Sequence, residues 1–305
     1  MELRSGRRVR SSEQLGLGGG DDLISALPDD LLVLVLARLP CAGAAAAART
    51  GVLSRRWRGL WARLRRIVLR DVPFHSLEPA LARVPRPPPT VSLLEIRLPK
   101  PRGRIPREQL VNRDRLYSVL RAVALALLDP EEFILAIPSC LVDSCLLVHL
   151  ISLHRTTSIV LDLILGPYLT IVCIPAGLEF PALETLSLSS CCIHFDALLP
   201  CCPRLRTLRL DDIWFTQGVL SIKPPLLQEL VVASTTSWIN QVNIVAPMLT
   251  QLTISVPTNP KVDISILAPM IEKVSWDYYF SMDSSVFGPW RLVQLSLQTP
   301  NFLSR

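Results

Sequence analysis

The residues best able to do chemistry are the eight cysteines and four histidines, and they gather in only one place. The pairs Cys191–Cys192 and Cys201–Cys202 lie close to His194 in the sequence, as a thiol nucleophile or a zinc site would require. However, the chain has no Cys-x-x-Cys pair, and adjacent cysteines seldom hold one metal ion with good geometry. We therefore expect reduced, mostly buried, structural thiols and no metal or other cofactor.

Motifs for other enzyme chemistry are missing from the sequence. There is no Gly-x-Ser-x-Gly elbow, no phosphate-binding loop and no His-Glu-x-x-His zinc motif. His149 and His154 are five residues apart in an apolar run, which is poor spacing for shared ligation on a helix. The sequence thus predicts a protein without catalytic residues that acts by binding. A thiol or zinc enzyme is an alternative.

The distribution of charge narrows the classes of partner. The formal net charge is +6, but residues 1–70 hold 13 arginines against six acidic residues, so the rest of the chain is almost neutral. Residues 1–20 combine arginines with a Gly-rich stretch, which is typical of a flexible arm. The apolar runs 133–153 and 158–178 are interrupted by Pro and Asp, which indicates buried strands rather than membrane spans. We expect neither a nucleic-acid nor a membrane partner, and a cytoplasmic or nuclear location.

A protein that acts by binding needs elements that position its contact residues. Residues 22–64 have the spacing of three short helices. The first helix is expected within Pro28–Pro40, the second over 44–49, and the third from Ser54, carrying both tryptophans of the segment on one face. About 45 residues are close to the lower limit for an independent core. Some of the apolar surface should therefore contact a partner or the rest of the chain.

The segment resembles an F-box of the kind found in plant proteins, with Leu-Pro-Asp-x-Leu-Leu early and Leu-Ser-x-Arg-Trp-x-x-Leu-Trp late. The middle, Ala44–Ala48, is richer in alanine than usual for that family. The residues that carry the resemblance are Leu27, Pro28, Asp29, Leu31, Leu32, Leu36, Leu39, Pro40, Ala48, Arg49, Thr50, Val52, Leu53, Ser54, Arg56, Trp57, Leu60 and Trp61.

The resemblance implies that this segment docks on a Skp-type adaptor, and through it on the cullin scaffold of a ubiquitin ligase. The residues expected to bind the adaptor are Leu27, Pro28, Leu31, Leu32, Leu36, Leu39, Pro40, Val52, Leu53, Trp57 and Trp61. Composition alone would equally allow these helices to pack on the remainder of the chain.

A repeat of 22 residues fills the second half of the sequence. Its frame is Leu-x-x-Leu-x-Leu, and in five units a proline stands two residues before the first apolar position. A 23-residue step before these units and a 21-residue step after them extend the series. The frames are Val160/Leu163/Leu165, Leu183/Leu186/Leu188, Leu205/Leu208/Leu210, Leu227/Leu230/Val232, Leu249/Leu252/Ile254, Ile271/Val274/Trp276 and Leu292/Leu295/Leu297.

Such a period predicts a solenoid in which each unit adds one short parallel strand and buries alternate side chains. The pattern resembles leucine-rich repeats; Cys191 matches the Asn or Cys of that family, whereas later units lack it. Leu93, Ile96 and Leu98 suggest a degenerate early unit, 116–128 a helix and 133–137 a buried strand.

The alternate positions of these strands point outward and are small, polar and nearly neutral. They suit a protein or peptide target, or solvent alone, better than nucleic acid. The residues proposed to line a target-binding concave face are Thr185, Ser187, Thr207, Arg209, Glu229, Val231, Gln251, Thr253, Lys273 and Ser275.

The predicted fold class is a multidomain α+β chain, with a three-helix F-box followed by an α/β leucine-rich-repeat solenoid. The expected divisions are 1–20 as an arm, 21–68 as F-box, 69–157 as linker and irregular early repeats, and 158–305 as repeats. The resemblance implies a non-catalytic substrate receptor of a cullin–RING ubiquitin ligase, with a non-ligase interaction scaffold as the alternative. No C-terminal FBD region is recognisable, and a shortened C-terminus is one interpretation.

Overall fold

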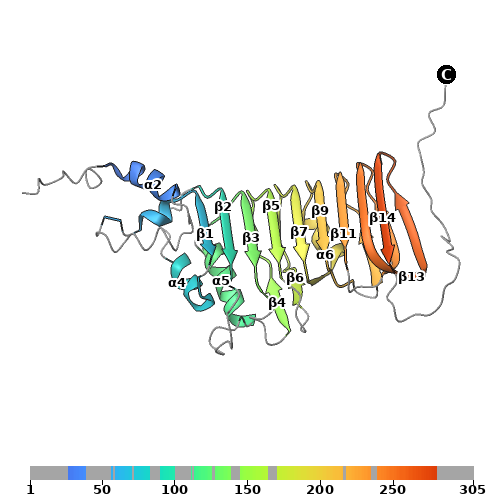
Figure 1. Ribbon diagram of the computed structural model, residues 1–305, viewed down its shortest axis with the longest axis horizontal. Coiled ribbons are helices and arrows are strands. Elements are labelled where there is room, and N and C mark those ends of the chain that lie inside the picture. Colours follow the sequence, from blue (N-terminus) through green and yellow to red (C-terminus); the bar gives the residue numbers. More distant parts are fainter. Residues whose placement is uncertain are drawn as a thin grey trace, which may run out of the picture.

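The computed structural model shows an elongated solenoid of parallel strands, with the helix over Asp29–Ala37 at its N-terminal end (Figure 1). The described residues are 27–38, 56–57, 59–70, 72–82, 90–99, 111, 113–125, 128–138, 145–163, 170–215, 218–234 and 239–279.

Helices are few in this part of the chain, and strands are many. The helical elements are α2 (Asp29–Ala37), η2 (Leu60–Arg63), η3 (Phe74–Ser76), α4 (Leu77–Leu81), α5 (Arg113–Leu125), α6 (Phe195–Leu198) and η6 (Leu199–Cys201). The strands are β1 (Arg66–Arg70), β2 (Leu93–Arg97), β3 (Glu132–Ala136), β4 (Leu146–His149), β5 (Ser158–Asp162), β6 (Thr170–Cys173), β7 (Thr185–Ser189), β8 (Cys192–Ile193), β9 (Thr207–Asp211), β10 (Val219–Ile222), β11 (Glu229–Ala233), β12 (Ile239–Val245), β13 (Gln251–Leu267) and β14 (Lys273–Tyr279).

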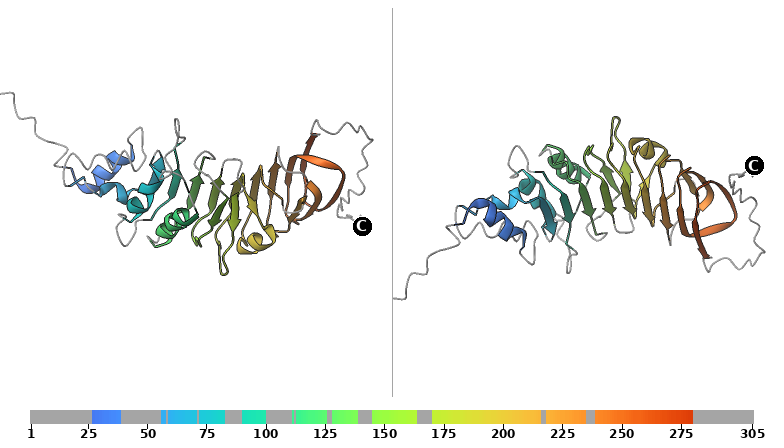
Figure 2. Two further views of the ribbon diagram at one scale, coloured as in Figure 1. Left: turned by 90° about the horizontal axis from the view of Figure 1, so that it is seen from below. Right: turned by 90° about the horizontal axis from the view of Figure 1, so that it is seen from above.

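One long sheet, here called the front sheet, runs the length of the molecule in the order β1-β2-β3-β5-β7-β9-β11-β13-β14. Each pair of neighbours is parallel, and the strands follow one another in chain order. Helices α5 and α6 lie on one side of this sheet in both views of Figure 2. The face turned away from them, here called the front face, is open along its middle and C-terminal strands.

Behind the front sheet, further strands close the middle and C-terminal coils. A 3-stranded sheet of order β4-β6-β8 backs the middle of the solenoid. Nearer the C-terminus, β10, β12 and the second half of β13 form the back layer, because β13 bends from one layer into the other. The back of the last described coils is therefore made of strands, not of the helices that an α/β repeat would supply.

The 22-residue repeat is confirmed by the strand register. Thr185 pairs with Thr207, Thr207 with Glu229, Glu229 with Gln251, and Gln251 with Lys273. The two inward columns are almost fully buried. They are Leu186, Leu208, Leu230 and Leu252, and Leu188, Leu210, Val232 and Ile254.

The repeated prolines form the corner between back and front layers. The amide of Leu249 donates to the Ala246 carbonyl at 3.1 Å, and the amide of Ile271 donates to the Ala268 carbonyl at 3.2 Å. Each is a four-residue turn with proline at its second position, where the fixed φ of proline suits the turn. The proline spacing thus marks where each coil turns into the front sheet.

The early coils differ from the predicted frames. Ser158 pairs with Thr185, 27 residues later, so Ile159 and Leu161 point inward and the Val160/Leu163/Leu165 frame is wrong. In β2, Leu94 and Ile96 join the inward column, a register two residues from the predicted one. The strand over Glu132–Ala136 and the helix over Arg113–Leu125 agree with the sequence-based expectation within a few residues.

The solenoid also begins earlier than the sequence indicated. Strand β1 already pairs with β2, so the front sheet starts at Arg66, within the range expected to be F-box. The buried apolar residues of α2, η2 and the strands form one continuous cluster. Within the described residues, no helix is long and apolar enough to cross a membrane.

The N-terminal helices are described only in part. Helix α2 lies where the first helix was expected, whereas the second expected helix and Ser54 lie outside the described residues. A continuous third helix is not seen, because Gly59 has a φ of 87° in the left-handed region and η2 begins only after it. The expected frame at 292–297 also lies outside the described residues.

Candidate functional site

Helix α2 begins as its sequence requires. The Pro28 carbonyl accepts hydrogen bonds from the amides of Leu31 and Leu32, each at 3.1 Å. Asp29 and Asp30 occupy the first turn, where negative charge is favoured by the helix dipole. The proline and the two aspartates thus fix the point at which this helix starts.

The apolar residues of α2 divide between two sides of the helix. Leu32 and Leu36, four residues apart, are fully buried against the chain. Leu31, Leu34 and Val35 lie on the other side with exposed fractions of 45%, 56% and 45%. A nine-residue helix with three large exposed apolar side chains presents a surface suited to a partner.

The buried side of α2 rests on the start of the solenoid. Trp57 and Trp61 are both 8% exposed, and Leu60 and Leu64 are buried beside them. All four belong to the continuous core, together with Ile67 of β1. Several residues predicted to bind an adaptor therefore have an internal packing role.

The eleven predicted adaptor-binding residues are thus distributed in three groups. Exposed or half-exposed residues are Leu27, Pro28 and Leu31, and buried residues are Leu32, Leu36, Trp57 and Trp61. Outside the described residues lie Leu39, Pro40, Val52 and Leu53. Leu34 and Val35 were missed, although the helical period places them beside Leu31 and away from Leu32.

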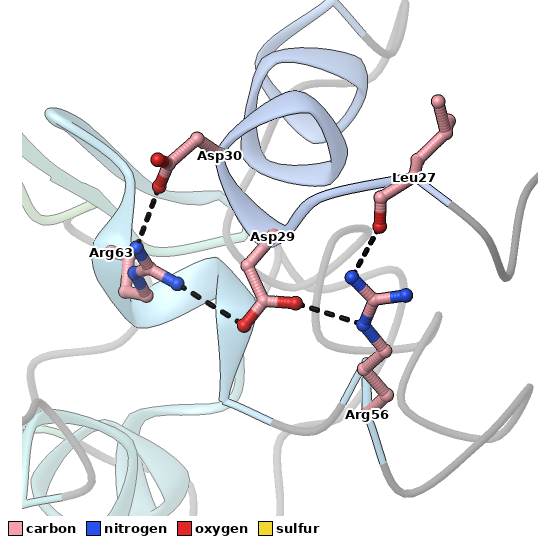
Figure 3. Close-up of polar contacts among 5 residues, drawn as sticks. All are labelled: Leu27, Asp29, Asp30, Arg56 and Arg63. Atoms are coloured by element: carbon pink, nitrogen blue, oxygen red, sulfur yellow. Dashed lines mark hydrogen bonds and ion pairs between the residues drawn. The ribbon is translucent and has the colours of Figure 1, made fainter.

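Ion pairs tie the start of α2 to the segment before β1, as Figure 3 shows. The Arg56 Nε lies 2.8 Å from Asp29 Oδ1, and Arg56 also donates to the carbonyl of Leu27. Arg63 Nη2 lies 2.8 Å from Asp30 Oδ1, and its Nη1 lies 3.5 Å from Asp29 Oδ2. These groups are largely exposed, so each pair contributes about 1 kcal/mol at most. Their joint effect is to orient α2.

A second candidate surface is the front face of the sheet. Side chains of its middle strands alternate between half-buried and buried, as in β7 and β11. All residues predicted to bind a target lie on this face, because the strand register places them side by side. Arg209 Nη2 and Glu229 Oε1 are 3.0 Å apart across neighbouring strands, so these two charges neutralise each other.

The first strands carry a charge cluster on the front face that the sequence did not reveal. Glu95 of β2 is 3% exposed and receives two hydrogen bonds from Arg70, at 2.9 and 3.0 Å. Arg97 also donates to it. Burial alone would raise the pKa of Glu95, but hydrogen bonds and charge from both arginines lower it overall.

Farther along, the carboxyl ends of the strands are acidic. Asp162 and Asp211 occupy the same row of the sheet, with Ser189 of β7 between them. The pKa of Asp211 is raised by burial first, and then by the negative charges of Asp212 and Asp162. The front face is therefore neutral overall but has basic and acidic regions.

Two of the four cysteines in the cysteine-rich segment, Cys191 and Cys202, are buried. Burial raises the pKa of Cys191 to about 12, with a smaller effect of Cys192, and Cys202 has the same value for the same main reason. Cys191 faces the core whereas His194 is exposed. No group of three or more potential metal ligands occurs among the described residues.

Comparison with known proteins gives one match. Residues 24–69 match the F-box domain, which covers α2, η2 and most of β1. No curated protein matches the chain, and no solved structure matches it. The domain match therefore covers the α2 site and most of the first front-sheet strand, and the residues predicted to bind a target lie outside it.

Proposed function

We propose that this protein is the substrate-receptor subunit of a cullin–RING ubiquitin ligase, with α2 docking on a Skp-type adaptor and the solenoid holding a target protein. F-box domains generally bind such adaptors, and the single observation that carries the proposal is the domain match over residues 24–69. The exposed side of α2 lies within that match and supplies a surface for the contact.

Adaptor binding is assigned here to Leu31, Leu34 and Val35 in particular. Full burial of one such side chain is worth about 1.5–3 kcal/mol, and these are roughly half exposed. Leu32, Leu36, Trp57 and Trp61 support the same contact indirectly, by packing α2 and its neighbours against the solenoid. Arg56 and Arg63 hold the start of the helix in the orientation that exposes Leu31.

The role proposed for the chain is positional rather than catalytic. Holding a target close to a ubiquitin-loaded enzyme raises its effective concentration, with no covalent step on the receptor itself. The front face, with Thr185, Arg209 and Thr253 among its members, is one proposed contact for the target. The proposal also includes leucine-rich-repeat character for the solenoid and a cytoplasmic or nuclear location for the protein.

A pull-down with a purified Skp-type adaptor tests the docking surface. The variant Leu31→Ser/Leu34→Ser should lose most adaptor binding while keeping its thermal stability, because both residues are exposed. Val274→Ser is the matched control, since Val274 is 51% exposed and lies in the last described strand.

Two results would contradict the proposal. Undiminished binding by the double variant would remove the assignment to α2. Adaptor binding without recruitment of a cullin would favour the alternative of an interaction scaffold outside the ligase.

A further inference from the structure

The corner turns of the last coils present an apolar ridge. The residue after each corner proline is exposed: Leu226 by 43%, Met248 by 43% and Met270 by 53%. These three residues are spaced by one repeat each, so they occupy the same place in successive coils. Ala182 and Arg204 hold that place in the two preceding coils.

The stacking of the coils brings these side chains together. At the same corner, the amide of Thr250 donates to the Gln228 carbonyl, and the amide of Glu272 donates to the Thr250 carbonyl, both at 2.9 Å. Neighbouring coils are thus joined by ladder bonds, with a spacing of about 4.8 Å. The ridge therefore spans about 10 Å from the first side chain to the third.

Further apolar groups widen the ridge on its back-sheet side. Leu267 is 41% exposed and pairs in register with the half-buried Val245. The third position of a corner turn faces solvent and would accept any polar residue at little cost. Leucine and methionine at three consecutive corners are consistent with a contact surface, and methionine adapts readily to varied partners.

Positive charge borders one end of the ridge. Arg204 and Arg206 belong to the coil before Leu226, and Lys223 lies three residues before it. All three side chains are exposed. In the described part of the chain, neither Arg204 nor Arg206 forms an ion pair. The surface is therefore apolar over three coils and basic beside the first of them.

We infer that this ridge binds an amphipathic helix of a partner protein, with acidic residues at the end that lies over Arg204 and Arg206. A helix advances about 5.4 Å per turn, so apolar residues at i, i+4 and i+7 match the spacing of three coils. Carboxylates at one end complete the match by charge. Where the partner is a ubiquitination target, this inference rests on the proposed function and locates the target on the corner as well as the front face.

The ridge lies at the opposite end of the solenoid from α2, as Figure 1 shows for the coils of β11, β13 and β14. Adaptor docking and helix binding are therefore separable by mutation. Loss of adaptor binding would affect only the proposed function, and loss of helix binding would affect only this inference.

The test uses the full-length protein and three fluorescent 14-residue helical peptides. All carry polar residues elsewhere; the first has Leu at i, i+4 and i+7 with three Glu at one end. The second has Lys in place of Glu, and the third has Ser in place of Leu. Fluorescence anisotropy should show saturable binding of the first, binding weaker by about tenfold or more for the second, and none for the third.

Protein variants locate the site. Met248→Gln/Met270→Gln should weaken binding of the Glu peptide by about tenfold or more, because it removes apolar contacts from exposed positions without opening a cavity. Tyr117→Gln, a polar substitution at a 50% exposed residue of α5, is the matched control and should bind as the unmodified protein does.

Four outcomes of the peptide-binding experiments would overturn the inference. They are absence of Glu-peptide binding, equal binding of the Lys peptide, equal binding by the double variant, and tighter peptide binding after removal of residues 280–305. Sedimentation provides a further check, since self-association lost in Met248→Gln/Met270→Gln would assign the ridge to a second copy of the chain. The peptide contrast on the unmodified protein remains decisive even if a variant folds poorly.

Discussion

At the scale of single residues, Glu95 is the polar group that matters most for the first strands of the front sheet. Its carboxylate is buried on the front face and accepts hydrogen bonds from Arg70 and Arg97, whose own side chains are 59% and 43% exposed. Replacing it by glutamine removes the negative charge that both guanidinium groups share, although the amide oxygen can still accept one hydrogen bond. The resulting loss is limited because both arginines can still reach water.

We expect Glu95→Gln to lower the free energy of unfolding at pH 7 by about 1–2 kcal/mol. Hydrogen bonds and charge from Arg70 and Arg97 lower the pKa of Glu95 below its ordinary value, so its charge contributes fully to stability at pH values above that ordinary value. That contribution disappears as pH falls through the lowered pKa, and the variant should then equal the parent. Urea titrations at pH 7 and near pH 3 measure the free energy of unfolding of the variant and of the parent. Glu132→Gln, an exposed change on the neighbouring strand, should have little effect at either pH.

The reactivity of each cysteine thiol also depends on its own surroundings. A pKa of about 12 leaves roughly one Cys191 or Cys202 side chain in ten thousand as thiolate at pH 8. Brief alkylation followed by mass spectrometry should therefore label the exposed Cys145 and leave these two unmodified. In denaturant all three should react. Rapid labelling of Cys191 in the native protein would contradict the burial that the structure shows and reopen the thiol-enzyme alternative.

At the scale of elements, the strand alternation decides which substitutions matter. Leu230 of β11 is fully buried between Leu208 and Leu252, whereas Val231, its neighbour in the same strand, is half-buried on the front face. Leu230→Ala should lower the free energy of unfolding by about 2–5 kcal/mol, because it leaves a cavity in the inward column. Val231→Ala should cost about 1 kcal/mol or less. Urea denaturation compares the two, and similar losses would mean that the register is wrong.

The same elements show how far the sequence could predict the fold. Where coils have equal length, the Leu-x-x-Leu-x-Leu frame locates each strand, and the register from β7 to β14 follows it. The early coils vary in length: Leu93 pairs with Glu132, 39 residues later, and Ser158 with Thr185 only 27 later. With no constant period, short apolar runs cannot fix which residue faces inward. The frame at Val160 failed for this reason.

The candidate site was predictable only in part, for a related reason. The motif places Leu31 and Leu32 in the same helix, but only the packing of α2 shows that one is exposed and the other buried. Apolar character predicts both an interior and an interface. The sequence therefore indicated the segment now proposed to dock on an adaptor, while the structure shows that Leu31, Leu34 and Val35 are its exposed apolar residues.

At the scale of the whole molecule, the F-box segment and the solenoid are physically continuous. Most of strand β1 lies inside the F-box match, and β1 is also the first strand of the front sheet. The buried cluster extends from Leu32 and Leu36, through Trp61 and Ile67, into the later coils. In a solenoid each coil contacts mainly its neighbours, so a defect should be felt locally rather than throughout. The orientation of α2 should therefore depend on the first coils far more than on the last.

This dependence yields a prediction for two matched core substitutions. Ile67→Ala in β1 and Leu252→Ala in β13 each remove a residue that is at most 1% exposed, and each should lower stability by about 2–5 kcal/mol. Hydrogen exchange should then show faster opening of α2 in Ile67→Ala, and of β11, β12 and β14 in Leu252→Ala. Adaptor binding should weaken only in the first variant. Equal acceleration of exchange in α2 by both would show that the solenoid unfolds as one unit, and the helix proposed to dock on the adaptor would then report on the stability of the whole solenoid.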